Sequence, residues 1–340
     1  MSSAAGAVAA ALEAAATRLG PMARAEEPIG PRTTYRVGGA ARLYVEVDDV
    51  ATLDRVAEVV AATGVPTLVV GQGSNLLVAD AGFDGLAIAL GPGFGGVEHG
   101  DATSPSGRPP TGPVGDAGRA WAQVGGGARL PVVARRLARA GLGGFEWAVG
   151  VPGSMGGAVR MNAGGHGSDL AACLVLAEVV DLRTAERRAW SAAELAFGYR
   201  RSALGHAHVV TGAELALERG DPARSLALLD EIVAWRRANQ PGGQNAGSVF
   251  TNPPGDHAGR WVEAAGCKGL RLGSAEVSAK HANFIQADPC GRAGDVWRLM
   301  AEVRRRVVAA GGPDLWPETV LVGFPAVAPV GGPTEGRVAG

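Results

Sequence analysis

Two glycine-rich stretches contain the residues whose types and spacing point most directly to chemistry. Residues 149–165 read VGVPGSMGGAVRMNAGG, and residues 71–75 read GQGSN between the apolar segments 65–70 and 76–78. Glycine allows the backbone to approach a ligand closely, and successive exposed N–H groups in such loops bind anions. The order of strand, polar glycine loop and apolar segment predicts phosphate-binding loops at a sheet edge. The alternative is a tight packing corner between strands.

Neither stretch is a standard nucleotide-binding loop. No Gly-Lys-Ser/Thr follows residues 71–75, and position 76 is Leu where the dinucleotide fingerprint requires glycine. Residues 91–96, GPGFGG, do match G-x-G-x-x-G, but the Pro- and Gly-rich run that follows predicts no helix to hold a pyrophosphate. We therefore expect no Rossmann site at residues 91–96.

Four motifs follow one another along the chain: GQGSNLLV, VPGSMGGAVRMNAG, FGYRRS at 197–202 and AGSVFTNPPG at 246–255. Together they resemble the UDP-N-acetylenolpyruvoylglucosamine reductase family over roughly residues 28–325. The resemblance implies a cytoplasmic enzyme with non-covalently bound FAD that consumes NADPH. Such an enzyme reduces UDP-N-acetylglucosamine enolpyruvate to UDP-N-acetylmuramate for peptidoglycan synthesis, with hydride passing from NADPH to the flavin and then to the enol ether.

The resemblance also implies the catalytic side chains. Arg200, in FGYRRS, is a fixed cation able to hold a carboxylate, Ser248 has a hydroxyl in a glycine-flanked turn, and Glu318 stands at the start of the last predicted strand. The arginine and the glutamate are implied to stabilise the enolic intermediate, and the serine to protonate it. The alternatives are structural: a surface ion pair for Arg200, a turn or helix cap for Ser248 and a strand-end cap for Glu318.

The other site residues are assigned mainly by the same resemblance. Tyr199 is expected to position the substrate carboxylate, and SAKHANF resembles a loop that contacts or supports the substrate. The expected cofactor-binding residues are Tyr35, Arg36, Gly71, Gly73, Ser74, Asn75, Pro152, Gly153, Ser154, Gly156, Gly157, Asn162 and Gly164. The expected substrate-binding residues are Tyr199, Asn252, Lys280 and His281.

Two features depart from the family pattern. The serine motif often continues Lys-Asn-Pro, whereas Thr251 stands here in place of the lysine. A cation for the substrate phosphates must then come from elsewhere, with Arg260 and Lys268 as candidates. The short interval between Arg200 and Ser248 indicates the form of the family that lacks an extra substrate-capping loop.

Composition argues against several function classes. A formal net charge of −1 predicts no general attraction to nucleic acid, and no stretch is long and apolar enough for a membrane span. Cys173, Cys267 and Cys290 are far apart, lack metal-ligand spacing and indicate a reducing compartment. His206 and His208 have no third ligand nearby, so we expect them to face solvent and predict no metal site.

The predicted elements mix strands and helices. Strands are expected at 41–47, 65–70, 86–90, 120–124, 174–181, 207–216 and 319–324. Helices are expected at 1–18, 51–63, 129–140, about 222–238, near 258–265 and at 293–309, with a short helix opened by a capping box at Ser191–Glu194. The first helix lacks the basic start of a signal peptide. The 222–238 helix is expected to present an apolar face that includes Leu226, Leu229, Ile232, Val233 and Trp235.

This order of elements predicts an α+β fold. With the resemblance, we expect a two-part FAD-binding region of the vanillyl-alcohol-oxidase/PCMH type, followed by a smaller α+β substrate-binding domain. The expected parts are an N-terminal helix and extension at 1–27, the FAD-binding domain at 28–218, the substrate-binding domain at 219–325 and a disordered tail at 326–340. A mobile surface insertion is expected at about 98–118. No feature of the sequence indicates an oligomeric state.

Two rival functions stay open. An FAD-linked oxidase or dehydrogenase of the same fold acts on alcohols or sugars and often tethers FAD through an early His or Cys, which residues 35–75 lack. A non-enzymatic nucleotide-binding module uses the glycine loops alone, and leaves Arg200, Ser248 and Glu318 unexplained.

Overall fold

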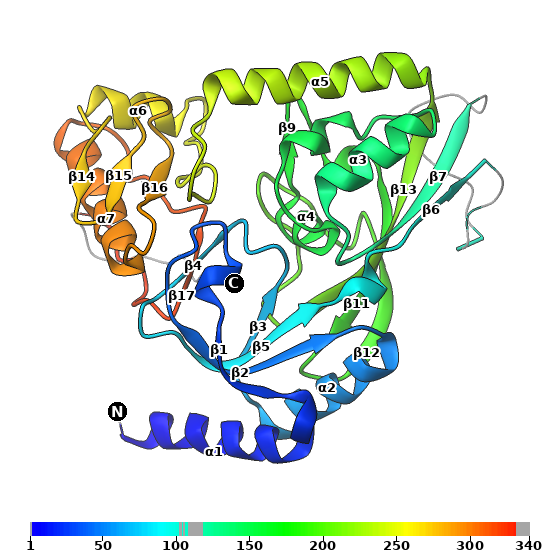
Figure 1. The fold of residues 1–340 in the computed structure, drawn as a ribbon, viewed down its shortest axis with the longest axis horizontal. Coiled ribbons are helices and arrows are strands. Elements are labelled where there is room, and N and C mark those ends of the chain that lie inside the picture. The colour runs from blue at the N-terminus through cyan, green and yellow to red at the C-terminus, as the bar shows by residue number, and fades with distance from the viewer. Residues whose placement is uncertain (1, 102–103, 105, 108–117, 331–340) are drawn as a thin grey trace. The chain divides into compact units, whose positions relative to one another are not determined.

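The computed structural model describes residues 2–101, 104, 106–107 and 118–330, which are coloured by residue number in Figure 1. Contacts between residues divide the chain into two compact units. The first comprises Met1–Ala25, Leu43–Gln72 and Gly85–Arg236, and the second comprises Glu26–Arg42, Gly73–Asp84 and Arg237–Gly340. Two short N-terminal segments therefore belong with the C-terminal part of the chain. The domain limits expected from the sequence stay predictions.

A six-stranded antiparallel sheet forms one part of the first unit, in the order β12-β11-β13-β7-β6 with β8 paired to β13. Its strands are β6 (Val97–Gly100), β7 (Arg119–Gly125), β8 (Leu142–Gly143), β11 (Leu174–Asp181), β12 (Glu186–Ser191) and β13 (His208–Arg219). Helices α3 (Leu130–Arg139), α4 (Met155–Met161) and α5 (Pro222–Asn239) contribute apolar side chains to the core over this sheet. Beyond α4, the short strands β9 (Gly164–Gly165) and β10 (Ser168–Asp169) pair with each other.

A second core of the first unit includes side chains of two helices and of strands β2 and β5, which belong to a four-stranded sheet in the order β1-β2-β5-β3. The elements are α1 (Ser2–Leu19), β1 (Arg24–Pro28), β2 (Ala40–Val47), α2 (Val50–Thr63), β3 (Thr67–Val70) and β5 (Phe83–Leu90). Helix α2 begins where Asp49 accepts a hydrogen bond from Thr52 N at 2.7 Å, and it ends at Gly64, whose φ is +64°. Its buried residues recur at helical spacing, so this amphipathic face packs against the sheet.

The second unit places helix α7 (Ala293–Ala309) on the three-stranded sheet of β14 (Arg271–Leu272), β15 (Ala275–Val277) and β16 (Ile285–Ala287), as Figure 1 shows. Helix α6 (Ala258–Ala264) packs against α7. Strands β4 (Leu76–Val78) and β17 (Val320–Val322) pair in parallel, with Leu76 opposite Val320. This pair joins the end of the first glycine loop to the segment that contains Glu318.

Most of the predicted elements are confirmed, and α7 and β11 have the predicted bounds. The short helix predicted at Ser191–Glu194 is wrong. The capping-box bonds do form, with Ser191 N donating to Glu194 Oε2 at 2.8 Å and Glu194 N donating to Ser191 Oγ at 3.3 Å. Ala196 then takes a φ of +44°, so the chain leaves helical geometry after a single turn. Strand β12 was not predicted.

Three further expectations need correction. The predicted mobile insertion at about 98–118 is wrong at its start, because residues 98–100 belong to β6, which pairs with β7. Residues 102–103, 105 and 108–117 of that insertion lie outside the described residues, as do residues 331–340 of the tail predicted at 326–340. Trp235 does not join the apolar face of α5: it is 48% exposed and makes an edge contact with the ring of His166. His206 is exposed as expected, whereas His208 is not.

Candidate functional site

The first glycine loop, residues 71–74, lies between β3 and β4. Its backbone N–H groups donate no hydrogen bond to any other residue of the described chain. Gly73 has a φ of +59°, and a Cβ added there would lie 2.6 Å from Thr33 Cα. Thr34 N donates to Gly73 O at 3.1 Å, and a Cβ on Gly71 would lie 2.4 Å from Ser154 Oγ. The loop thus presents unused donors, as an anion-binding loop requires.

The second glycine loop leads into helix α4. Residues 152–153 precede the helix, and Ser154 is its N-cap. Ser154 Oγ accepts from Gly157 N at 3.3 Å, and Gly156 N donates to Gly126 O at 2.8 Å. These donors are therefore used within the protein. A Cβ on Gly156 would lie 3.2 Å from Gly126 O, so the close packing of two backbones explains this glycine. Gly156 and Gly157 therefore fit the alternative given in the sequence analysis, a tight packing corner. Their contact with a cofactor stays a prediction.

Arg200 lies at the tip of a tight turn. Gly198 N donates to Arg201 O at 3.0 Å and Arg201 N donates to Gly198 O at 3.2 Å, which leaves Tyr199 and Arg200 between them. Arg200 has a φ of +56°, a conformation that residues other than glycine rarely adopt and that is enriched at functional sites. Its Nη2 donates to Gly164 O at 3.0 Å, while Tyr199 is 57% exposed. The turn therefore fixes the guanidinium and presents the tyrosine to solvent.

Asn162 connects this turn to helix α4. Its Nδ2 donates to Asp169 Oδ2 at 3.0 Å and to Gly198 O at 3.2 Å, and its Oδ1 accepts from Ala171 N at 3.0 Å. The side chain is buried, and both ends of its amide already have protein partners. These bonds give Asn162 a structural role beside the Arg200 turn, and its contact with a cofactor stays a prediction.

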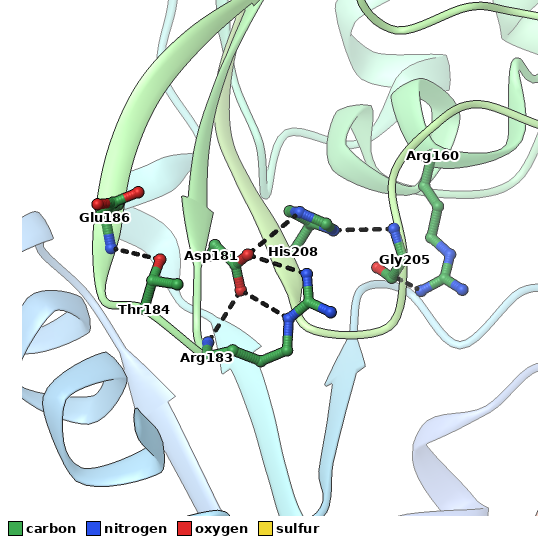
Figure 2. Close-up of polar contacts among 7 residues, drawn as sticks. All are labelled: Arg160, Asp181, Arg183, Thr184, Glu186, Gly205 and His208. Atoms are coloured by element: carbon green, nitrogen blue, oxygen red, sulfur yellow. Dashed lines mark hydrogen bonds and ion pairs between the residues drawn. The ribbon is translucent and has the colours of Figure 1, made fainter. Parts of the chain in front are cut away.

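Figure 2 shows the hydrogen bonds at the C-terminal end of the segment that connects β12 to β13 and contains Arg200. Arg160 Nη1 donates to Gly205 O at 3.3 Å, and Gly205 N donates to His208 Nδ1 at 2.8 Å. The His208 side chain is 9% exposed, with Nε2 3.6 Å from Asp181 Oδ2, and Arg183 binds the same carboxylate. Burial lowers the pKa of His208, although Asp181 opposes the shift. The prediction of a solvent-facing His208 is wrong because a backbone donor and a carboxylate hold its ring.

In the second unit, Ser248 and Glu318 lie on two paired segments. Glu318 N donates to Val249 O at 2.7 Å. Asn75 Nδ2 donates to Glu318 O at 3.0 Å, and Val320 N donates to Asn75 O at 2.9 Å. Ser248 Oγ makes no hydrogen bond with another residue in the part of the chain described. Tertiary contacts thus bring two predicted catalytic residues together, and Asn75 supports their frame with its own amide.

Three buried hydroxyls near these segments have no hydrogen-bond partner among the described residues: Thr34 Oγ1, Tyr35 OH and Thr319 Oγ1. Burial raises the pKa of the Tyr35 hydroxyl, so this group stays protonated and able to donate. Leaving a buried polar group unpaired costs about 1–3 kcal/mol, so such groups indicate a missing partner. FAD carries phosphates, hydroxyls and ring acceptors that fit these donors and the open N–H groups of the first glycine loop. Thr34 and Thr319 were not predicted, although each directly adjoins a predicted residue.

The predicted substrate-binding residues of the second unit all have protein partners. Lys280 Nζ donates to Arg237 O at 2.5 Å, Asn252 Oδ1 accepts from Ala258 N at 3.0 Å, and His281 Nδ1 accepts a backbone hydrogen bond at 3.3 Å. Burial lowers the pKa of His281. These contacts stabilise turns and a helix end within the protein. The substrate-binding roles of Lys280, Asn252 and His281 stay predictions.

The two candidate replacements for the lysine missing at position 251 are both paired with carboxylates. Arg260 binds Asp256, and this hydrogen bonding lowers the pKa of Asp256. Lys268 Nζ lies 2.8 Å from Glu263 Oε1. Arg36, by contrast, is exposed with a φ of +55° and forms no polar side-chain contact with the residues described. Its guanidinium is therefore available to an anionic ligand.

Among the described residues, no three His, Cys, Asp or Glu side chains are grouped so that they could hold a metal ion. No helix there is both long and apolar enough to cross a membrane.

Comparison with known proteins identifies the family. Residues 41–186 match the FAD binding domain family, and residues 239–322 match the C-terminal domain of UDP-N-acetylenolpyruvoylglucosamine reductase. The chain is 39% identical to the UDP-N-acetylenolpyruvoylglucosamine reductase of Rubrobacter xylanophilus (91% of this chain, 98% of the relative), and 38% identical to that of Chloroflexus aurantiacus (87% and 96%).

A solved structure agrees. The crystal structure of UDP-N-acetylenolpyruvylglucosamine reductase from Thermus caldophilus superposes with a TM-score of 0.72 at 33% identity, and covers 88% of this chain and 99% of that one. The predicted α+β fold, an FAD-binding region followed by a C-terminal domain, is therefore confirmed. The chain belongs to the UDP-N-acetylenolpyruvoylglucosamine reductase family.

Proposed function

We propose that this protein reduces UDP-N-acetylglucosamine enolpyruvate to UDP-N-acetylmuramate, with FAD as its bound cofactor and NADPH as the electron donor. Family membership supports this assignment. The structural observation that carries it is the pairing of the Ser248 and Glu318 segments through Glu318 N and Val249 O. When bound, FAD supplies the hydride that the enol ether receives.

The cofactor is held mainly by the first glycine loop and its neighbours. The unused N–H groups of residues 71–74 bind phosphate oxygens. The hydroxyls of Thr34 and Tyr35, which lack a protein partner, hydrogen-bond the same cofactor. Arg36 supplies a positive charge next to them.

Ser248 is the proton donor in this reaction. Hydride adds to the vinyl carbon that does not bear the carboxylate, and negative charge develops on the other vinyl carbon and its carboxylate. That second carbon then takes the proton of the Ser248 hydroxyl. That hydroxyl makes no competing hydrogen bond within the described chain, and it later recovers a proton from water. Glu318 contributes, with Arg200, to stabilising the enolic intermediate.

Arg200 holds the developing carboxylate charge. A guanidinium is always charged and binds a carboxylate with two N–H groups. The positive φ of Arg200 and its bond to Gly164 O hold this group in place before substrate arrives. Tyr199, exposed beside it, contacts the same substrate group.

We place the enzyme in the cytoplasm, because its three cysteines are all free thiols and therefore fit a reducing compartment.

The test is an anaerobic titration of the purified protein. A flavin absorption band should bleach when NADPH is added and return when the enolpyruvyl nucleotide is added, with UDP-N-acetylmuramate as product. A flavin that bleaches but does not respond to the nucleotide, and is reoxidised instead after oxidation of an alcohol or sugar, would favour the rival FAD-linked oxidase. A protein that binds no FAD would refute both functions.

A further inference from the structure

We infer that Asn283 is a positioning residue for the protonation step, because it fixes the backbone on which Ser248 is carried. Asn283 lies in the SAKHANF stretch that the sequence predicts to contact or support the substrate, but the sequence predicts no role for this side chain. The inference rests on the proposed function and extends it to a residue that does not touch the reacting atoms.

Asn283 acts as a strand partner to the residues after Ser248. Its Oδ1 accepts from Phe250 N at 3.0 Å, its Nδ2 donates to Phe250 O at 2.8 Å, and its backbone O accepts from Val249 N at 2.9 Å. The last of these bonds fixes the peptide group that joins Ser248 to Val249. The orientation of the amide is unambiguous, because the backbone of Phe250 offers a fixed donor and a fixed acceptor.

Every backbone polar group of Val249 and Phe250 has a hydrogen-bond partner within the protein. Val249 and Phe250 are 0% and 1% exposed, so their four backbone polar groups need partners inside the protein. Asn283 satisfies three of these groups, and Glu318 N satisfies the fourth through Val249 O. One edge of the Ser248 segment is therefore fixed by Asn283 and the other by the segment of Glu318.

This arrangement assigns Asn283 a task beyond packing. A proton donor must reach its target atom within hydrogen-bond distance, and a misplacement of about 1 Å can lower a rate about 100-fold. The side chain of Ser248 has no hydrogen bond of its own within the described residues, so its position depends on the backbone that bears it. Asn283 is itself 4% exposed, so its amide is shielded from bulk solvent.

The test separates the two half-reactions in the FAD-loaded enzyme by anaerobic stopped-flow absorbance. Asn283→Asp keeps the acceptor for Phe250 N but sets a carboxylate oxygen against Phe250 O, and Asn283→Gln keeps both groups but moves them by one methylene. Each variant should slow reoxidation of the reduced flavin by the enolpyruvyl nucleotide about 10- to 100-fold. Flavin reduction by NADPH should stay within about twofold of the unsubstituted enzyme, and the solvent deuterium isotope effect on reoxidation should rise.

Two controls separate positioning from stability. Ser274→Ala removes a partly buried hydrogen bond to Asp295 in the same unit. This substitution should leave both half-reactions unchanged. In a Ser248→Ala background, Asn283→Gln should slow reoxidation no further, because both substitutions then act on the same step.

Other outcomes overturn the inference. Equal slowing of both half-reactions, or a further tenfold loss in the Ser248→Ala background, would show that Asn283 acts on the fold as a whole. Reoxidation of both Asn283 variants at the unsubstituted rate would show that it has no role in catalysis. Failure of the proposed function is a different result, since the unsubstituted enzyme itself would then not be reoxidised by the nucleotide.

Discussion

Replacing Gly73 by Ala tests whether the shape of the first glycine loop is what allows FAD to bind. Gly73 has a φ of +59°, and an added Cβ would lie 2.6 Å from Thr33 Cα and 2.7 Å from Arg32 O. Both neighbours are backbone atoms, which cannot rotate away as the end of a side chain can. Gly64 provides a matched control, because it has a φ of +64° but nothing within 4 Å of an added Cβ.

The magnitude follows from these two geometries. A residue other than glycine in the left-handed region is destabilised by about 1–2 kcal/mol, and this applies to both positions. Carbon atoms normally approach to about 3.5–4.0 Å, so residues 32–33 must shift by about 1 Å in Gly73→Ala. Such overpacking costs about 1–3 kcal/mol more. The unfolding free energy should therefore fall by about 1–2 kcal/mol in Gly64→Ala and by about 2–5 kcal/mol in Gly73→Ala.

The assay combines urea unfolding of the FAD-free protein with FAD titration. Because the shifted residues 32–33 pack against the glycine loop and lead directly into Thr34 and Tyr35, Gly73→Ala should weaken FAD binding about tenfold or more, while Gly64→Ala should leave the FAD dissociation constant unchanged. Equal stability losses with equal FAD affinities in the two variants would refute the reasoning.

Three other predictions follow from the site. Ser248→Ala should lower the rate of flavin reoxidation by the enolpyruvyl nucleotide about 10²–10⁴-fold and leave reduction by NADPH unchanged in stopped-flow traces; normal reoxidation would exclude Ser248 as proton donor. Ser154→Ala removes the N-cap of α4, so the unfolding free energy should fall by about 0.5–2 kcal/mol in urea titrations, and an unchanged midpoint would contradict the cap. Because burial lowers the pKa of His208 below the value of about 6.5 in an unfolded chain, the unfolded state binds the extra proton first. The stability that neutral His208 contributes is therefore present above about pH 6.5 and is lost as the pH falls. In His208→Gln, the unfolding free energy should fall less steeply between pH 7 and pH 5 than in the unsubstituted protein. Parallel pH profiles of the two proteins would refute this.

Local sequence patterns were sufficient for most of the secondary structure. Helix α2 could be predicted because its apolar spacing, its aspartate cap and its terminal glycine are all signals within a few residues of one another. The capping box at Ser191–Glu194 shows the limit of such signals, since the same bonds form without a helix when the chain turns at Ala196. The family could also be predicted, because four short motifs in order are a property of the sequence itself.

The sequence by itself determined the fold class and the family, since these depend on local spacing and on motifs, and it predicted the cofactor loops and the reactive side chains. Only the tertiary structure decided which polar groups are already occupied. Asn75 meets Glu318 across 243 residues, Asn283 meets Phe250 across 33, and His208 turns inward to a backbone donor. A side-chain amide or imidazole can bind many partners, and its choice is made by the distant backbone groups that folding brings within hydrogen-bond reach.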